Sequence, residues 1–182
     1  MIRLRPKSKS KDPFVRYSVN AFYHFTDLRN LAMIREHGGL YSLHQLQERE
    51  IEIPIPGGNE LSHELDAEKG LDHYIHLCFK KDHPMEFVAR QEGRLGKLIY
   101  LEVHPKVRKF DGVRFAPDVS NKTGVCTHPF EEALDLIDFE VLYTITDWND
   151  PPIQERLKQA EKSELLVPDH IPLKYIRNCP NG

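Results

Sequence analysis

Short aromatic and β-branched runs alternate with helical stripes along this chain. Residues 21–25 are rich in aromatic side chains and predict a strand. Apolar positions within residues 28–34 follow a helical spacing, and Gly38 is a suitable end for that helix. His24 and Thr26 are therefore expected where a strand leads into a helix.

The rest of the pattern predicts more short strands and short helices. Further strands are expected at residues 74–79, 97–103, 113–116, 163–167 and 173–176. Further helices are expected at residues 43–50, 84–91, 130–136 and 151–161. Proline and glycine break regular structure at residues 54–59, and residues 120–129 are expected to form a loop. This mixture is typical of an α+β fold and not of a doubly wound parallel sheet.

The length and the charge distribution indicate one domain behind a basic start. The chain has 182 residues, which suits a single domain with a short tail. The first sixteen residues contain one acid, Asp12, and these basic residues: Arg3, Arg5, Lys7, Lys9, Lys11 and Arg16. We interpret residues 1–18 as a basic N-terminal tail or arm and residues 19–182 as the domain. A solvated tail and an arm that contacts phosphates both fit this segment.

The overall composition narrows the class of protein. A net charge of −3 and a pI near 6.4 argue against a surface that binds nucleic acid throughout. Nothing approaches the roughly 20 consecutive apolar residues of a membrane span, and the start lacks the apolar core of a secretory signal. The three cysteines, Cys78, Cys126 and Cys179, are widely spaced and indicate reduced thiols. We therefore expect a cytoplasmic protein with no membrane partner.

Familiar nucleotide and metal motifs are absent from the sequence. There is no Gly-x-Gly-x-x-Gly or Walker pattern, which argues against a Rossmann or P-loop nucleotide site. The ten histidines include no His-x-x-x-His and no His-Glu-x-x-His. His73 and His76 are placed on a predicted strand, where residues three apart face opposite sides. We therefore expect no bound metal ion.

Three segments contain residue types that suit chemistry. They are Tyr23–Thr26 near the start, Leu46–Glu50 before the proline- and glycine-rich loop, and Lys162–Val167 near the end. Each is weak alone, because a histidine on an aromatic strand is more often packed, and a glutamate at a strand start is more often solvated.

Their order along the chain resembles the DarT family of DNA ADP-ribosyltransferases. The resemblance extends from residue 22 to residue 177 and rests on short motifs in a particular order. These are Tyr23-His24-Phe25-Thr26, Asn30-Leu31, Leu46-Gln47-Glu48-Arg49, Gly57-Gly58, Leu71-Asp72-His73-Tyr74, Pro84-Met85, and the Asp150–Glu164 segment.

The resemblance implies a fold, a substrate and a set of roles. The fold would be the ADP-ribosyltransferase core, with two small splayed β-sheets around an NAD cleft. Glu164 would be the catalytic carboxylate, and Arg49 would stand in or near the place of the family's catalytic arginine. The residues implied to bind NAD are His24, Phe25, Thr26, Asn30, Gly39, Leu40 and Tyr74. The acceptor would be a base in single-stranded DNA, and a toxin of this kind would have an antitoxin partner.

The physical chemistry of NAD cleavage suits these residue types. Breaking the bond between nicotinamide and ribose builds positive charge on the sugar, as in glycoside hydrolysis. A carboxylate about 4 Å away stabilises that charge by roughly 4 kcal/mol at an effective dielectric near 20. A carboxylate can also accept a ribose hydroxyl or take a proton from a base nitrogen. A guanidinium is a rigid fork of donors that suits a pyrophosphate.

Two other functions stay open at this stage. Relatives with the same core remove 2′-phosphates from RNA with NAD, and Lys80, Lys81, Arg90 and Arg94 could hold such a phosphate. The other is a binding module without catalysis, because Glu50 and Cys78 depart from the family pattern. The loop at residues 118–121 departs from that pattern too. The departure in that loop leaves open which base is modified, and whether it belongs to DNA or RNA.

Overall fold

Two antiparallel sheets organise the protein, which is a computed structural model that describes residues 9–179 except 82, 94–95, 145–146 and 148. The larger sheet has five strands in the order β4-β1-β3-β6-β5, and the smaller pairs β2 with β7. The larger sheet consists of β1 Phe22–Asp27, β3 Tyr74–Cys78, β4 Leu98–Val103, β5 Arg114–Ala116 and β6 Glu164–Pro168. The smaller consists of β2 Gly39–Tyr41 and β7 His170–Pro172.

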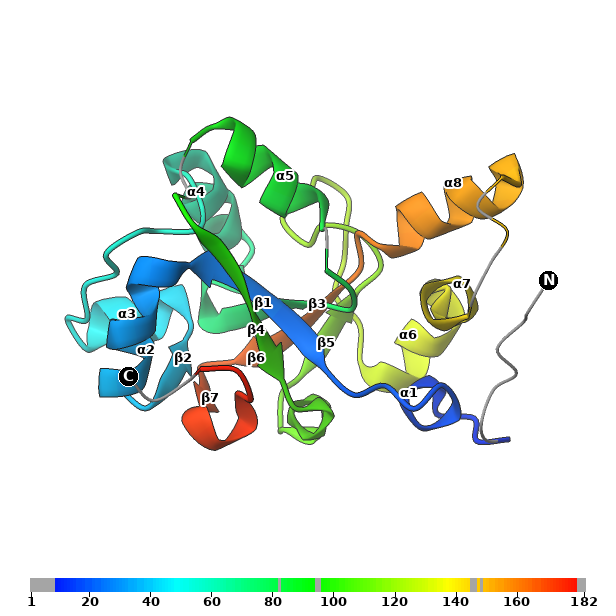
Figure 1. Cartoon of the computed structure of the whole chain (residues 1–182), viewed down its shortest axis with the longest axis horizontal. Coiled ribbons are helices and arrows are strands. Elements are labelled where there is room, and N and C mark those ends of the chain that lie inside the picture. The colour runs from blue at the N-terminus through cyan, green and yellow to red at the C-terminus, as the bar shows by residue number, and fades with distance from the viewer. Residues whose placement is uncertain (1–8, 82, 94–95, 145–146, 148, 180–182) are drawn as a thin grey trace.

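Helices lie in groups around the larger sheet (Figure 1). Beside the smaller sheet are α2 Leu31–Glu36 and α3 Leu43–Glu48, and at the top of the view are α4 Glu60–Glu68 and α5 Pro84–Gln91. The opposite side has α6 Phe130–Leu136, α7 Phe139–Tyr143 and α8 Pro151–Ala160, with α1 Pro13–Arg16 below them. Short 3-10 helices are η1 Leu28–Asn30, η2 Leu71–His73, η3 Pro105–Lys109 and η4 Leu173–Tyr175. Within the described part of the chain, no helix combines the length and apolar content needed to span a membrane.

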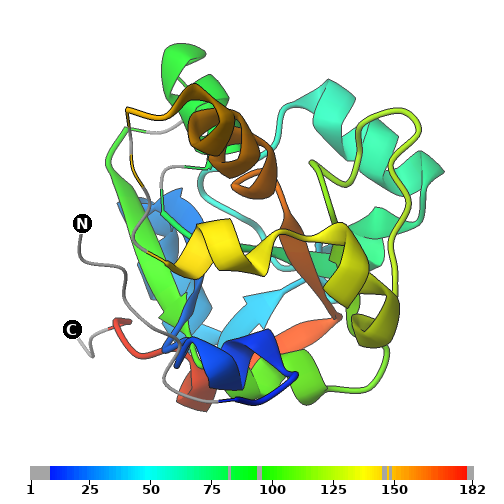
Figure 2. The same ribbon diagram turned by 90° about the vertical axis from the view of Figure 1, so that its right-hand side faces the viewer.

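The core includes a residue that we expected to lie in the tail. Phe14 of α1 is 4% exposed, and its ring centroid lies 5.2–6.2 Å from those of five other phenylalanines, on β1, β5, α6, α7 and just after β3. Figure 2 shows α1 next to α7. Asp12 caps this short helix by accepting a hydrogen bond from the Phe14 amide at 3.0 Å. The packed part of the chain therefore begins before residue 19, while Arg3, Arg5 and Lys7 lie outside the described residues.

One predicted strand was wrong. Residues 173–175 form the 3-10 turn η4, and the strand β7 lies just before it, where Ile171 pairs with Leu40 of β2. The Leu173 amide donates to the Gly38 carbonyl at 2.7 Å, and the Ile176 amide donates back to the Leu173 carbonyl at 2.9 Å. These bonds close a turn where the apolar pattern alone suggested an extended segment.

The other predicted strands and helices are present within two residues at each end, with η1 directly before α2. Three helices had no counterpart in the prediction: α1, which lies in the segment predicted as a tail, α4 and α7. Helix α4 buries none of its residues and so shows no apolar stripe, although Asn59 caps it by accepting from the Ser62 amide at 2.8 Å. Helix α7 is only five residues long. Cys78, Cys126 and Cys179 are unpaired.

Candidate active site

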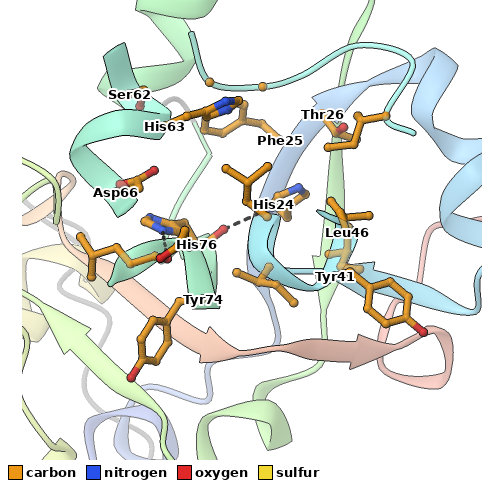
Figure 3. A pocket seen from close by; sticks show the side chains of 18 of the residues that line it. His24, Phe25, Thr26, Tyr41, Leu46, Ser62, His63, Asp66, Tyr74 and His76 are labelled. Atoms are coloured by element: carbon orange, nitrogen blue, oxygen red, sulfur yellow. Dashed lines mark hydrogen bonds between the residues drawn. The ribbon is translucent and has the colours of Figure 1, made fainter. Parts of the chain in front are cut away.

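A pocket opens where β1, β3 and β6 face α3, α4 and the loop at residues 53–58 (Figure 3). The structure brings eight of the nine predicted site residues to its wall: His24, Phe25, Thr26, Asn30, Gly39, Leu40, Tyr74 and Glu164. Arg49 is not among the lining residues. Residues more than 100 positions apart in sequence are therefore neighbours around one cavity.

Glu164 is a buried carboxylate held in a fixed orientation. It is the first residue of β6, pairs with Cys78 of β3, and is 5% exposed. Its Oε2 accepts hydrogen bonds from the Ser120 amide at 2.9 Å and the Ser120 hydroxyl at 2.5 Å. Oε2 also lies 3.5 Å from Nδ1 of His76. The second oxygen, Oε1, accepts no hydrogen bond from a described residue, and Nε2 of His83 lies 3.9 Å from it.

His76 and Glu164 form an ion pair at the pocket wall. The register sets His76 two residues before Cys78 on the same face of β3, diagonally across from Glu164. Burial alone lowers the pKa of His76, but the hydrogen bond and charge of Glu164 outweigh it and raise that pKa to about 9. Burial raises the pKa of Glu164, yet His76, His83 and Ser120 together lower it to about 2. At neutral pH the glutamate is therefore ionised and the histidine protonated.

This pair predicts a pH window for stability. The contribution of His76 is complete below its ordinary pKa of 6.5 and is lost as the pH rises through about 9. The contribution of Glu164 is present above its ordinary pKa of 4.5 and is lost as the pH falls through about 2. We expect the difference in melting temperature between wild type and His76→Leu to be largest between pH 4.5 and 6.5. A difference that does not vary with pH would show that the two side chains are not paired.

The loop that contains Ser120 is tied to the rest of the site by charged side chains. Lys69, just after α4, donates from Nζ to the carbonyls of Ser120 at 3.0 Å, Lys122 at 2.6 Å and Val125 at 3.3 Å. Asp118 accepts from Lys122 Nζ at 2.7 Å and from Gln159 Nε2 at 3.4 Å. The hydroxyl that orients Glu164 is thus held from two sides.

His24 presents a hydrogen-bond acceptor to the pocket. Its Nδ1 lies 3.1 Å from the His76 carbonyl, which can only accept, so Nδ1 has the proton (Figure 3). Burial lowers the pKa of His24, and the nearby charge of His76 lowers it further. The ring is therefore neutral, and its Nε2 is free to accept from a ligand hydroxyl.

Asn30 and Gly39 have structural roles beside the pocket. The Asn30 amide donates to Thr26 Oγ1 at 3.0 Å and to the Ile55 carbonyl at 2.7 Å, and its oxygen accepts from the Ile55 amide at 3.0 Å. It therefore fastens the proline- and glycine-rich loop over β1. Gly39 has a φ of 152°, and a Cβ there would lie 2.1 Å from the Ile171 carbonyl oxygen. Only glycine allows β7 to approach this closely.

Arg49 lies at the rim of the pocket. It is exposed, donates from Nε to Gln45 Oε1 at 3.1 Å, and places its guanidinium 4.9 Å from the ring centre of Tyr41. Tyr41 lines the pocket and stacks on His170 at 4.1 Å. Glu50 has a φ of 54° and is exposed where the chain leaves α3.

Sequence reasoning did not identify three polar residues of this site: Asp66, His76 and Ser120. Asp66 belongs to the unpredicted helix α4, and Ser120 belongs to a loop with no motif of its own. The sequence placed His76 on a strand but gave no reason to pair it with Glu164. Only the register of β3 with β6 provides that reason.

The structure also brings together potential metal ligands that the sequence search did not connect. Nitrogen and oxygen atoms of His44, Asp72 and His73 all lie within 4.8 Å of one another. Two imidazoles and a carboxylate are ligand types that zinc uses. They come from α3 and η2, beside the pocket that Asp72 also lines.

Comparison with solved structures identifies relatives of this fold. Thermus sp. 2.9 DarT in complex with ADP-ribosylated ssDNA matches with a TM-score of 0.67 and 18% identity, over 87% of this chain and 79% of that chain. The same protein in complex with NAD+ gives a TM-score of 0.58 and 20% identity, over 87% and 80%. Thermosipho africanus DarTG in complex with ADP-ribose gives a TM-score of 0.65 and 18% identity, over 86% of this chain and 42% of that chain. A search of curated proteins found no significant match.

The fold is therefore the one found in these DarT structures, and the expected α+β core with two β-sheets is confirmed. The family model described as "ssDNA thymidine ADP-ribosyltransferase, DarT" matches residues 23–179. The chain belongs to the DarT family, as the order of its short motifs predicted. NAD+ is the substrate found in solved members of this family.

Proposed function

We propose that this protein transfers ADP-ribose from NAD to a base in single-stranded DNA and releases nicotinamide. The observation that supports this most is the ionised Glu164 at the pocket wall, with Oε2 fixed by Ser120 and His76 and Oε1 left for a ligand. The related structures contain NAD+ and ADP-ribosylated ssDNA, which makes the same substrates the first to test.

The geometry suggests how the chain would assist cleavage of NAD. The neutral His24 ring and the Thr26 hydroxyl would hold ribose hydroxyls. Glu164 would lie beside the ribose, where its negative charge stabilises the cation that forms as nicotinamide leaves. Phe25, Leu40 and Tyr74 would supply an apolar wall that keeps water from this cation.

We also propose that the protein is a toxin with an antitoxin partner. The support is its family, together with its likeness to the DarTG structure. Growth arrest on expression of the wild type, relieved by Glu164→Gln, would support this role. Equal growth with the wild type and with Glu164→Gln would contradict the toxin role.

The acceptor can be identified directly by mass spectrometry. The protein is incubated with isotope-labelled NAD and either single-stranded DNA or RNA, and the digested nucleosides are analysed. We expect an ADP-ribosyl adduct on one DNA nucleoside, with thymidine the first to examine because the family description names it. Adducts on RNA alone would overturn the choice of DNA.

The RNA 2′-phosphotransferase alternative has less support from the geometry. Lys80, Lys81 and Arg90 are not among the residues that line the pocket in the described part of the chain, and Arg94 lies outside that part. Lys81 instead contacts Glu102 at 3.5 Å, and Arg90 pairs with Glu86 at 2.6 Å. Loss of phosphate from 2′-phosphorylated RNA in the presence of NAD would revive this alternative.

A module without catalysis is tested by ligand-induced stabilisation. NAD at 100 times its dissociation constant should add about 2.7 kcal/mol to the free energy of unfolding. Failure of NAD to raise the melting temperature would favour the non-catalytic alternative.

Arg49→Ala gives a prediction about the rim of the pocket. We propose that the guanidinium, now over the Tyr41 ring, moves onto the bound substrate and stabilises charge in the transition state. The variant should then transfer ADP-ribose about 10²-fold more slowly, the usual loss for one such donor. Steady-state kinetics measure this, with Arg35→Ala on α2 as the comparison. An unchanged rate would place the role elsewhere.

A further inference from the structure

A second carboxyl group faces the same pocket from another element. Asp66 lies on α4 and lines the cavity with its neighbours Ser62 and His63. Its Oδ1 is buried and has no hydrogen-bond partner among the described residues. Figure 3 shows Asp66 pointing toward the space beside His76. A buried carboxylate oxygen without a partner is costly, so it indicates a place for a donor from a ligand.

The surroundings make Asp66 chemically unlike Glu164. Burial raises the pKa of Asp66 above its ordinary 3.8, and the charge of Glu164 raises it too. The charge of His76 on β3 lowers that pKa by more than Glu164 raises it. Asn121 in the loop and His63 on the same helix lower the pKa by less, but the effect of burial is the largest. The pKa of Glu164 is instead lowered, to about 2. Two carboxyl groups whose pKa values are shifted in opposite directions are suited to different roles in acid–base chemistry.

Transfer to a nucleic-acid base needs a group that accepts the proton of the base, and Glu164 is poorly suited to accept it. Oε2 of Glu164 is already occupied by Ser120 and His76, and Oε1 is the oxygen left for the ribose in the proposed function. A carboxylate that holds its proton so weakly is a weak base, and protonation would cancel the charge that stabilises the ribose cation. Asp66 has a free oxygen and no cation that pairs with it at hydrogen-bond distance among the described residues.

We propose that Asp66 takes the proton that the acceptor base loses, while Glu164 stays ionised beside the ribose. This inference rests on the proposed transfer to a base. A nitrogen of the base forms the bond to ribose C1′, and the bond from C1′ to nicotinamide breaks. That bonding pair goes to the pyridinium nitrogen, so nicotinamide leaves neutral. The N–H proton of the base goes to the Asp66 carboxylate and then to water.

The test compares Asp66→Asn with the wild type. Asparagine keeps the size and polarity of the side chain but cannot act as the base, so kcat should fall by about 10²-fold or more. The KM for NAD should stay the same, because the loss is confined to proton transfer. Glu64→Gln, an exposed site on the same helix, should keep the wild-type rate.

The pH profile separates a proton acceptor from a structural residue. In the wild type, kcat should fall as the pH drops through the raised pKa of Asp66, because the protonated carboxyl cannot accept. That acid limb should disappear in Asp66→Asn. In Asp66→Ala, added formate should restore part of the rate, because a small carboxylate can enter the vacated space.

The possible outcomes distinguish a failure of this inference from a failure of the proposed function on which it rests. No transfer by the wild type would overturn the proposed function and this inference together. A wild-type kcat and an unchanged acid limb in Asp66→Asn would overturn the inference alone. Stabilisation of Asp66→Asn by NAD, measured as a rise in melting temperature, shows that the variant is folded and binds substrate.

Discussion

Glu164→Gln should transfer ADP-ribose about 10³-fold more slowly than the wild type. Glutamine has the same shape but no charge, so the attraction to the ribose cation, roughly 4 kcal/mol at about 4 Å, is lost. A loss of about 4 kcal/mol from the transition state corresponds to nearly three powers of ten in rate. The rate of adduct formation with saturating NAD and single-stranded DNA measures it.

The control for this variant must show that the fold survives. Glutamine can still accept the hydrogen bond that the Ser120 amide now donates to Oε2 at 2.9 Å, so the loop at residues 118–126 should keep its position. Glu155→Gln makes the same change at an exposed site on α8 and should have the wild-type rate. A Glu164→Gln protein that is folded and transfers at the wild-type rate would contradict the role of Glu164.

The strands of the larger sheet were predictable because their local pattern agrees with their environment, whereas β2 and β7 of the smaller sheet were not predicted. The aromatic run that begins β1 and the β-branched and leucine-rich run of β4 both supply residues with no exposure, Phe22 and Leu101 among them. Helix α4 could not be predicted in this way. It packs no apolar face into the core, and its capping residue Asn59 is the main local signal.

The site was predictable only in part, for a related reason. The resemblance supplied His24, Thr26 and Glu164, which the structure places around one pocket. It gave no indication of Asp66 or His76, since their meeting depends on the register of β3 and the packing of α4. For Gly39, the resemblance implied a role in NAD binding. The structure shows a second reason for glycine at this position, because β7 approaches its backbone closely.

Phe14→Ala should destabilise the protein by about 3–5 kcal/mol, the usual cost of removing a buried phenylalanine. Phe14 fills the space between the sheet and helices α6 and α7, with rings of Phe22 and Phe139 at 5.3 Å and 5.2 Å. The guanidinium of Arg108 covers its ring at 5.0 Å and pairs with Asp12 at 2.5 Å. Urea unfolding, followed by circular dichroism, measures the loss as a lower transition midpoint at an unchanged slope.

The neighbouring residue distinguishes core packing from a general effect on the first helix. Val15 is 50% exposed on the same turn, so Val15→Ala should change the free energy of unfolding by no more than about 0.5 kcal/mol. A similar small change for Phe14→Ala would mean that α1 is peripheral and that the domain begins after it, as the charge pattern suggested. A large change for Phe14 alone means that the basic start of the chain is anchored in the core by one aromatic ring. Because β1 leads from that core to His24, the loss should also weaken NAD binding near the unfolding midpoint.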